Sequence, residues 1–196
     1  MAISKKEIKR KLFHVFNGVI TSTLIYFDIL NWFILLLIVI LGIILSFIAK
    51  NYHIQHLAFF LKHLDRDHDI RNFPGKGAIT FMFGCFIAVL FFSKDIAIAS
   101  ILIMAFGDAV SSIVSKSFGR LKHPLNSFKK LEGTLLAILI SFFIASFFVS
   151  YAEALFASII GMIVESIYFH NKNFFVDDNI LIPLFSGLTI FLLRLI

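Results

Sequence analysis

The sequence has little charge and almost no cysteine. Only 15% of its 196 residues are charged, whereas 59% are hydrophobic and 26 are phenylalanine. A water-soluble domain of this size could not bury so much apolar surface, so lipid is the expected solvent. The single cysteine, Cys85, excludes an internal disulfide and a cysteine-rich metal site.

Seven apolar segments follow one another along the chain. A hydrocarbon layer of about 30 Å needs roughly 20 helical residues, or fewer where polar flanks reach the headgroups. The sequence therefore predicts an all-α fold, a polytopic bundle of about seven transmembrane helices that forms a single domain over residues 1–196. The expected spans are Leu12 to Phe27, Trp32 to Ala49, Gly77 to Phe92, Ile96 to Ser115, Thr134 to Ser150, Ala152 to Phe169 and Asn179 to Ile196.

The basic residues indicate how this bundle is oriented. Cytoplasmic connections keep an excess of Lys and Arg during insertion. With the N-terminus in the cytoplasm, every Lys and Arg except Lys94 and Arg194 falls in a cytoplasmic segment. The net charge of +6 is thereby explained without a nucleic-acid partner. Because the external connections are very short, we expect a multi-pass protein of the cell membrane whose functional site faces the cytoplasm.

Two segments at this face suit anions. Lys11 and His14 lie at the entry to the first span, where the alternative is a basic anchor at the lipid headgroups. Arg71 precedes Pro74-Gly75-Lys76-Gly77-Ala78 at the N-terminus of the third span. Free backbone N–H groups, glycine and a lysine there favour a phosphate, although a simple Pro-Gly turn would have the same sequence.

Acidic residues at the same face suggest catalysis or metal binding. Asp108 is expected about two turns inside the membrane, where a carboxylate is a functional candidate unless it pairs with a structural Lys or Arg. An alternative role for Glu132 is only to stabilise the N-terminus of the fifth span, where the helix dipole favours an acid. Asp178 would cap the N-terminus of the last span. Glu165, Asp177 and Asp178 are also the hard oxygen ligands that Mg²⁺ prefers together with phosphate.

Cations, carboxylates and helix N-termini on one face suit phosphoryl transfer, because they stabilise the charge on the transferred group. In their order along the chain, the motifs resemble those of the CTP-dependent lipid-alcohol kinases, which include dolichol kinase, phytol kinase and CTP-dependent diacylglycerol kinase. The resemblance rests on Arg10-Lys11 with His14 and Gly18; Pro74-Gly75-Lys76-Gly77-Ala78; Gly107-Asp108-Ala109 with Gly119-Arg120; Lys130-Leu131-Glu132-Gly133-Thr134; and Glu165 followed by Asp177-Asp178-Asn179 and Pro183.

The resemblance implies transfer of the terminal phosphate of CTP to the hydroxyl of a membrane lipid, with Mg²⁺ or another divalent cation. The acceptor would be a polyprenol, phytol, geranylgeraniol or dolichol-like alcohol, or a diacyl or dialkyl glycerol. We expect Asp108 to be the base, because a buried carboxylate is a stronger base. The expected catalytic residues are Asp108, Glu132 and Asp178. The metal is expected at Asp108, Glu132, Glu165, Asp177 and Asp178. Nucleotide phosphates are expected at Lys11, His14, Arg71, Gly75, Lys76, Gly77, Arg120, Lys129 and Lys130.

Two other functions fit part of the pattern. Cytidylyl transfer from CTP to a phospholipid would use similar groups and release pyrophosphate. A membrane transporter would also carry intramembrane acids, but it would need polar residues through the full depth of the membrane. The outer halves of the predicted helices are nearly bare of charge, which favours the kinase.

Overall fold

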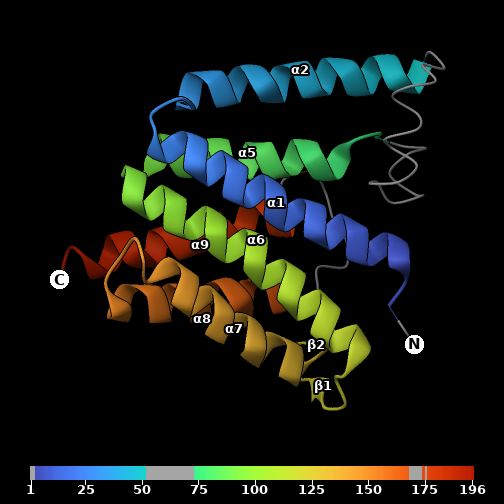
Figure 1. The fold of residues 1–196 in the computed structure, drawn as a ribbon, viewed down its shortest axis with the longest axis vertical. Helices are drawn as coiled ribbons and strands as arrows, with labels where there is room; N and C mark the ends of the chain where they lie inside the picture. The colour runs from blue at the N-terminus through green and yellow to red at the C-terminus, as the bar shows by residue number, and fades with distance from the viewer. Residues whose placement is uncertain (1–2, 52–72, 168–173, 175) are drawn as a thin grey trace.

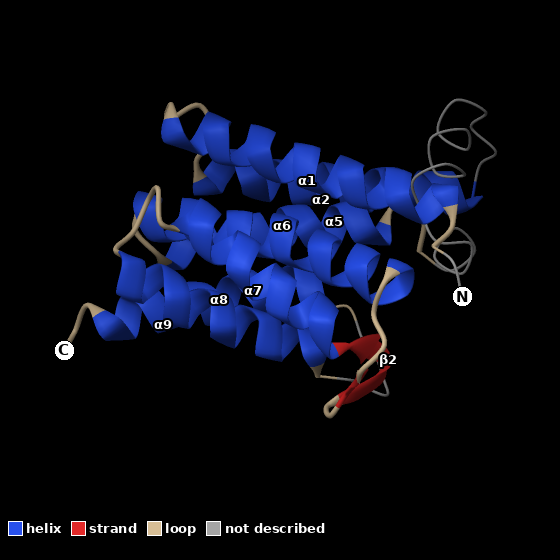
Figure 2. Cartoon of the chain, turned by 60° about the horizontal axis from the view of Figure 1, so that its bottom comes forward, coloured by secondary structure: helices blue, strands red, loops and turns tan. Residues whose placement is uncertain are grey.

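The computed structural model describes residues 3–51, 73–167, 174 and 176–196. In these residues the chain forms seven α-helices and one short hairpin (Figure 1 and Figure 2). The helices are α1 (Lys5–Tyr26), α2 (Trp32–Asn51), α5 (Lys76–Phe91), α6 (Lys94–Ser117), α7 (Leu131–Ala145), α8 (Tyr151–Ser166) and α9 (Asp178–Leu193). The hairpin pairs β1 (Lys122–His123) with β2 (Asn126–Lys130). The prediction of a helical fold is confirmed, and the hairpin adds to it.

The helices run back and forth between two ends of the bundle. The hairpin end carries the β1–β2 hairpin and the first residues of α1, α5, α7 and α9, and the turn end carries the C-terminus and the connections 27–31, 92–93 and 146–150 (Figure 1). Within the described residues, α2 and α6 are long and apolar enough to cross a membrane, whereas α5, α7 and α9 are apolar but shorter. Crossing by all seven helices stays a prediction.

Helix α6 is the centre of the bundle. It packs against α1, α5, α7, α8 and α9, and every residue from Ile96 to Ala105 is buried. Helix α2 lies at the periphery, packs against α5 and exposes most of its apolar side chains. The apolar surface of the molecule is therefore on its outside as well as in its core, as expected for helices that face lipid.

Glycine lets two neighbours approach α6 closely. A side chain on Gly18 of α1 would place its Cβ 2.3 Å from the Cβ of Ala105. A side chain on Gly133 of α7 would place its Cβ 2.2 Å from the hydroxyl of Ser115. Both distances are far below van der Waals contact, so these two motif glycines are required for helix packing.

Capping side chains set helix ends that apolar runs do not predict. α1 begins at Lys5 rather than at Leu12, because the hydroxyl of Ser4 accepts a hydrogen bond from the first turn. α7 ends at Ala145 rather than at Ser150, because Ser150 forms the capping box that starts α8. Polar residues thus extend or shorten the helices by one or two turns.

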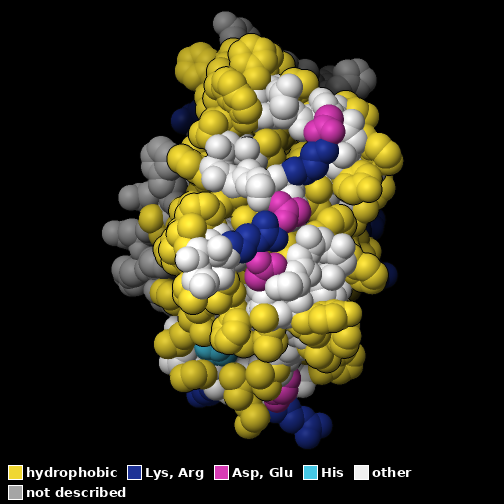
Figure 3. Space-filling view, turned by 90° about the vertical axis from the view of Figure 1, so that its left-hand side faces the viewer, with side chains coloured by type: hydrophobic (Ala, Val, Ile, Leu, Met, Phe, Trp, Pro, Cys, Tyr) yellow, Lys and Arg dark blue, Asp and Glu magenta, His cyan; other side chains and the backbone are white. Residues whose placement is uncertain are grey.

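Ion pairs close the turn end. Lys94 lies 2.6 Å from the carboxylate of Asp28. Arg194, just after α9, lies 2.7 Å from Asp95 of α6 and 2.7 Å from Glu153 of α8. Figure 3 looks onto this end and shows charged side chains set among hydrophobic ones. Both basic residues that were predicted outside the membrane are therefore neutralised by acids.

Candidate functional site

Asp108 of α6 forms a partly buried ion pair with α1. Its Oδ2 lies 2.5 Å from Nζ of Lys11 and 3.7 Å from Nε2 of His14. Lys11, His14 and Gly18 are each about one turn apart, so they share the face of α1 that packs on α6. Lys11 is only 5% exposed. The lysine that was expected to bind phosphate therefore compensates Asp108, which is the pairing that the sequence left as an alternative.

Glu165, in the last turn of α8, has two partners. Lys129 of β2 forms an ion pair with one carboxylate oxygen and donates a hydrogen bond to the backbone carbonyl of Glu165. The hydroxyl of Ser111, one turn beyond Asp108 on α6, donates to the other carboxylate oxygen at 3.1 Å. Glu165 is 1% exposed, so these contacts supply the charge and the donor that a buried carboxylate needs.

Polar side chains also join the starts of α5 and α9. The side-chain amide of Asn179 donates, through Nδ2, to the hydroxyl of Thr80 at 3.0 Å and to the backbone carbonyl of Gly77 at 3.4 Å. Pro183 follows Asn179 by one turn, and it has no N–H to donate to the Asn179 carbonyl. That carbonyl packs so closely against Gly84 that a Cβ there would lie 1.9 Å from it. The start of α9 is therefore fixed against α5.

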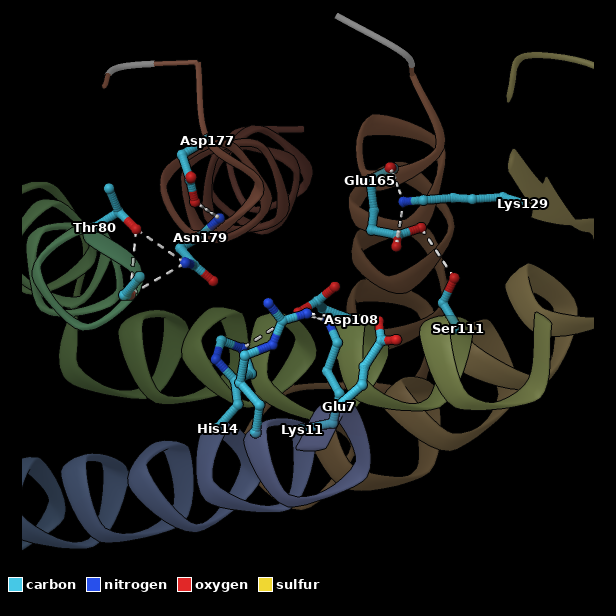
Figure 4. Close-up of polar contacts among 12 residues, drawn as sticks. Glu7, Lys11, His14, Thr80, Asp108, Ser111, Lys129, Glu165, Asp177 and Asn179 are labelled. Atoms are coloured by element: carbon cyan, nitrogen blue, oxygen red, sulfur yellow. Dashed lines mark hydrogen bonds and ion pairs between the residues drawn. The ribbon is translucent and has the colours of Figure 1, made fainter. Parts of the chain in front are cut away.

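These clusters lie around one region at the hairpin end. In Figure 4 the side chains of Asp108, Glu165 and Asn179, from α6, α8 and α9, face the space between these helices. The segments that carry them are far apart in the sequence. The fold thus brings together residues from motifs that the sequence analysis could only arrange in order.

Glu132 has a different environment. Its carboxylate accepts hydrogen bonds from the backbone N–H of Arg120 at 2.9 Å and of Leu121 at 3.0 Å. The N–H groups of Leu121 and Arg120 hold the pKa of Glu132 below its ordinary value. Glu132 therefore fixes the segment that leads from α6 to β1. The side chain of Arg120 is exposed, and the backbone N–H of Lys130 donates to the hydroxyl of Ser115 at 3.2 Å.

The Pro-Gly segment forms the start of α5. Gly75 has a φ of 79°, in the left-handed region that favours glycine, and α5 begins at Lys76. Gly77 is exposed, and a Cβ on it would meet nothing within 4 Å. Unlike Gly18, Gly77 is therefore not required by packing. Arg71, also expected to bind phosphate, lies outside the described residues.

Asp177 caps α9, whereas Asp178 was expected to do so. The carboxylate of Asp177 accepts a hydrogen bond from the backbone N–H of Asn179 at 3.1 Å, and Asp178 is the first residue of the helix. In the described part of the chain, no three His, Cys, Asp or Glu side chains are close enough to hold a metal. The five predicted metal ligands therefore do not assemble into a preformed cage.

Ser111 and Thr80 were missed by sequence reasoning. Ser111 bonds to Glu165, and Thr80 bonds to Asn179. A signal existed for Ser111, because it follows Asp108 by three residues and must lie near the same helix face. Hydroxyl residues are frequent in apolar helices, however, so spacing alone could not separate Ser111 from its neighbours.

Comparison with known proteins gives relatives of two kinds. An uncharacterised protein of Methanocaldococcus jannaschii is 29% identical over 184 residues, which cover 91% of this chain and 89% of that protein. CTP-dependent diacylglycerol kinase 1 of Saccharomyces cerevisiae is 27% identical over 141 residues, 69% of this chain and 48% of the kinase. A probable chloroplastic phytol kinase of Triticum aestivum is 33% identical over 135 residues, 60% of this chain and 44% of that protein.

The matches to the kinases are partial. The chain spans about half the length of the diacylglycerol and phytol kinases. No family model and no solved structure matches it. The named relatives are nevertheless those that the motifs at Asp108, Glu132 and Glu165 indicate. The resemblance is therefore confirmed: the chain's named homologues include CTP-dependent diacylglycerol kinases and phytol kinases.

Proposed function

We propose that this chain is a membrane-embedded kinase that transfers the terminal phosphate of CTP to the hydroxyl of a lipid alcohol. The observation that carries the proposal is the two partly buried ion pairs at one end of an apolar bundle, Asp108 with Lys11 and Glu165 with Lys129. Ionisable groups are costly in such surroundings and mark functional sites. The diacylglycerol kinases among the relatives are named for CTP as donor, and the other named relatives for phytol as acceptor.

We place the seven helices across the membrane with the hairpin end in the cytoplasm. The exposed apolar side chains of α2 support contact with lipid. The distribution of charge supports the orientation: the two cations of the turn end, Lys94 and Arg194, are paired with acids, whereas Lys and Arg are in excess at the hairpin end.

The lengths of the helices support a site at the inner edge of the membrane. α5, α8 and α9 have 16 residues each, or about 24 Å at 1.5 Å per residue, whereas the 24 residues of α6 span about 36 Å. Because Arg194 ties α6, α8 and α9 together at the turn end, the extra length of α6 lies at the hairpin end. Asp108 lies about 21 Å along α6 from Lys94. It is therefore level with the end of α8 and the start of α9, which both lie at the hairpin end. A lipid could present its hydroxyl there and keep its tail in the bilayer.

We assign the phosphates to Lys129, Lys76 and the start of α5. The side chain of Lys129 is 19% exposed, so its amine can contact a phosphate oxygen while it stays paired with Glu165. The open space around Gly77 allows a phosphate to approach the backbone N–H groups of the first turn of α5. Arg120 and Lys130, in and near the hairpin, would draw the nucleotide towards the site.

In the transfer, the oxygen of the lipid hydroxyl bonds to the terminal phosphorus of CTP, the bond to the bridging oxygen breaks, and CDP leaves. We assign to Asp108 the orientation of this hydroxyl and the acceptance of its proton, while Lys11 compensates the carboxylate before transfer. Asp177 and Asp178 are the residues that would hold Mg²⁺, which needs only one or two carboxylates when phosphates are its other ligands. Bound there, Mg²⁺ would neutralise phosphate charge.

The test is transfer of label from CTP to a panel of isoprenoid alcohols and glycerolipids by the purified protein. Label from the γ-phosphate that enters a lipid supports the proposal, and the label should be lost in Asp108→Asn. The matched control is Asp28→Asn at the turn end, which should keep activity because Asp28 has a φ of 59°, a conformation that Asn also adopts. Transfer of α-label with release of pyrophosphate would instead show cytidylyl transfer. No label in any lipid would refute both, and nucleotide-independent flux through proteoliposomes would indicate a transporter.

A further inference from the structure

The hairpin end exposes an amphipathic surface whose apolar side chains have no part in the proposed kinase reaction. Three apolar side chains are exposed on it: Phe118 by 78%, Leu121 by 60% and Leu125 by 50%. The exposed cations Arg120 and Lys122 lie between them in the sequence. We call these five residues the hairpin surface. A nucleotide alone would not require exposed Phe and Leu side chains next to the cations.

The side chains of this surface carry charge of one sign only, and the nearby acid Glu132 turns its carboxylate to the backbone N–H groups of Arg120 and Leu121. From Lys116 to Leu131 the sequence contains no Asp or Glu. The turn end is also apolar, but each of its two cations is paired with an acid. Apolar side chains alternating with exposed cations are typical of segments that lie in the interface of an anionic bilayer.

Hydrogen bonds tie part of the hairpin surface to the start of α7. The N–H groups of Arg120 and Leu121 donate to the carboxylate of Glu132, and the carbonyl of Leu121 accepts a hydrogen bond from the N–H of Leu131 at 3.0 Å. β2 follows directly and carries Lys129, which reaches Glu165. A force on the hairpin surface is therefore transmitted to a residue of the candidate site.

We propose that the hairpin surface docks on the headgroups of anionic lipids in the cytoplasmic leaflet, with Phe118, Leu121 and Leu125 inserted between them. This inference rests on the membrane placement given under the proposed function. Docking fixes the height of the hairpin relative to the bilayer, and with it the position of Lys129. Phosphate transfer should consequently be faster in bilayers that contain anionic lipid.

A tryptophan reporter tests the docking without any assay of activity. Trp32 is the only tryptophan of the chain and lies at the turn end. The variant Trp32→Phe/Leu125→Trp therefore reports on the hairpin alone. It is reconstituted in vesicles of phosphatidylcholine with brominated chains, with or without phosphatidylglycerol. We expect blue-shifted emission, and quenching that is stronger with phosphatidylglycerol and weaker at high salt.

Two further proteins make the result decisive. Adding Lys122→Gln should lower the ratio of inserted to free hairpin by about fivefold in anionic vesicles, and leave it unchanged in phosphatidylcholine. The native chain reports on Trp32 and so on the embedding of the bundle itself. Quenching of Trp32 without quenching at position 125 would overturn the docking and leave the membrane placement standing. Absence of quenching at both positions would overturn both.

Discussion

The ion pair between Asp108 and Lys11 can be separated experimentally into a structural and a catalytic part. Asp108→Asn keeps the shape of the side chain but leaves the ammonium of Lys11, 5% exposed, without a carboxylate. Removing one partner of a buried pair costs about 3–5 kcal/mol of folding stability. We therefore expect Asp108→Asn to lower the unfolding temperature as well as to abolish phosphate transfer, so its loss of activity alone would be ambiguous.

The double variant Asp108→Asn/Lys11→Met resolves the ambiguity. It removes both charges and keeps a long apolar side chain at position 11, a replacement that is often neutral or stabilising for a buried pair. Most of the lost stability should return, whereas phosphate transfer should stay absent, because Asp108 would act on the lipid hydroxyl. Unfolding in detergent and CTP-dependent labelling of lipid are measured on the same samples. Activity in the double variant would show that Asp108 only neutralises Lys11 and would refute its role as base.

Three other substitutions test separate parts of the site. Gly77→Ala should stabilise α5 by about 0.5–1 kcal/mol, because nothing blocks the added Cβ, and it should raise the KM for CTP. An unchanged KM would show that no phosphate binds at the start of α5. Lys129→Met should lower the unfolding temperature more than Glu165→Gln, because the carboxylate left behind is 1% exposed; equal losses would contradict the pairing. Glu132→Gln should flatten the acid side of the stability profile. Because folding lowers the pKa of Glu132, its carboxylate stabilises the folded state above pH 4.5, which is the ordinary pKa of a glutamate. This stability is lost as the pH falls towards the pKa of the folded state. An unchanged profile would contradict the backbone contacts.

The sequence predicted the helices well and their ends less well. Apolar runs and the alternation of basic residues located all seven described helices and placed the polar groups at one end. They could not show that Ser4 would extend α1, because capping depends on one hydroxyl rather than on mean hydropathy. They also did not predict the β1–β2 hairpin, whose two-residue β1 is too short for a periodic pattern.

The candidate site was predicted as a set of residues but not as a set of contacts. Asp108, Glu165 and Lys129 were all named from the sequence, and the structure pairs the last two across 36 positions of the chain. Such a pairing results from the packing of α6, α7 and α8, which local spacing does not encode. Glu132 shows the opposite problem, because a motif acid with a catalytic appearance turns to the backbone of Leu121 instead.

The glycines show most clearly what a motif can and cannot reveal. Gly18 and Gly133 belong to different motifs, yet both are explained by the close approach of a helix to α6. Gly77 has no such explanation, since an added Cβ would meet open space and the residue weakens the first turn of α5. A glycine that packing does not require, at a helix N-terminus beside Lys76, is best explained by something that approaches the backbone from outside. For this reason we assign a nucleotide phosphate to α5, and Gly18 and Gly133 to the architecture that holds Asp108 in place.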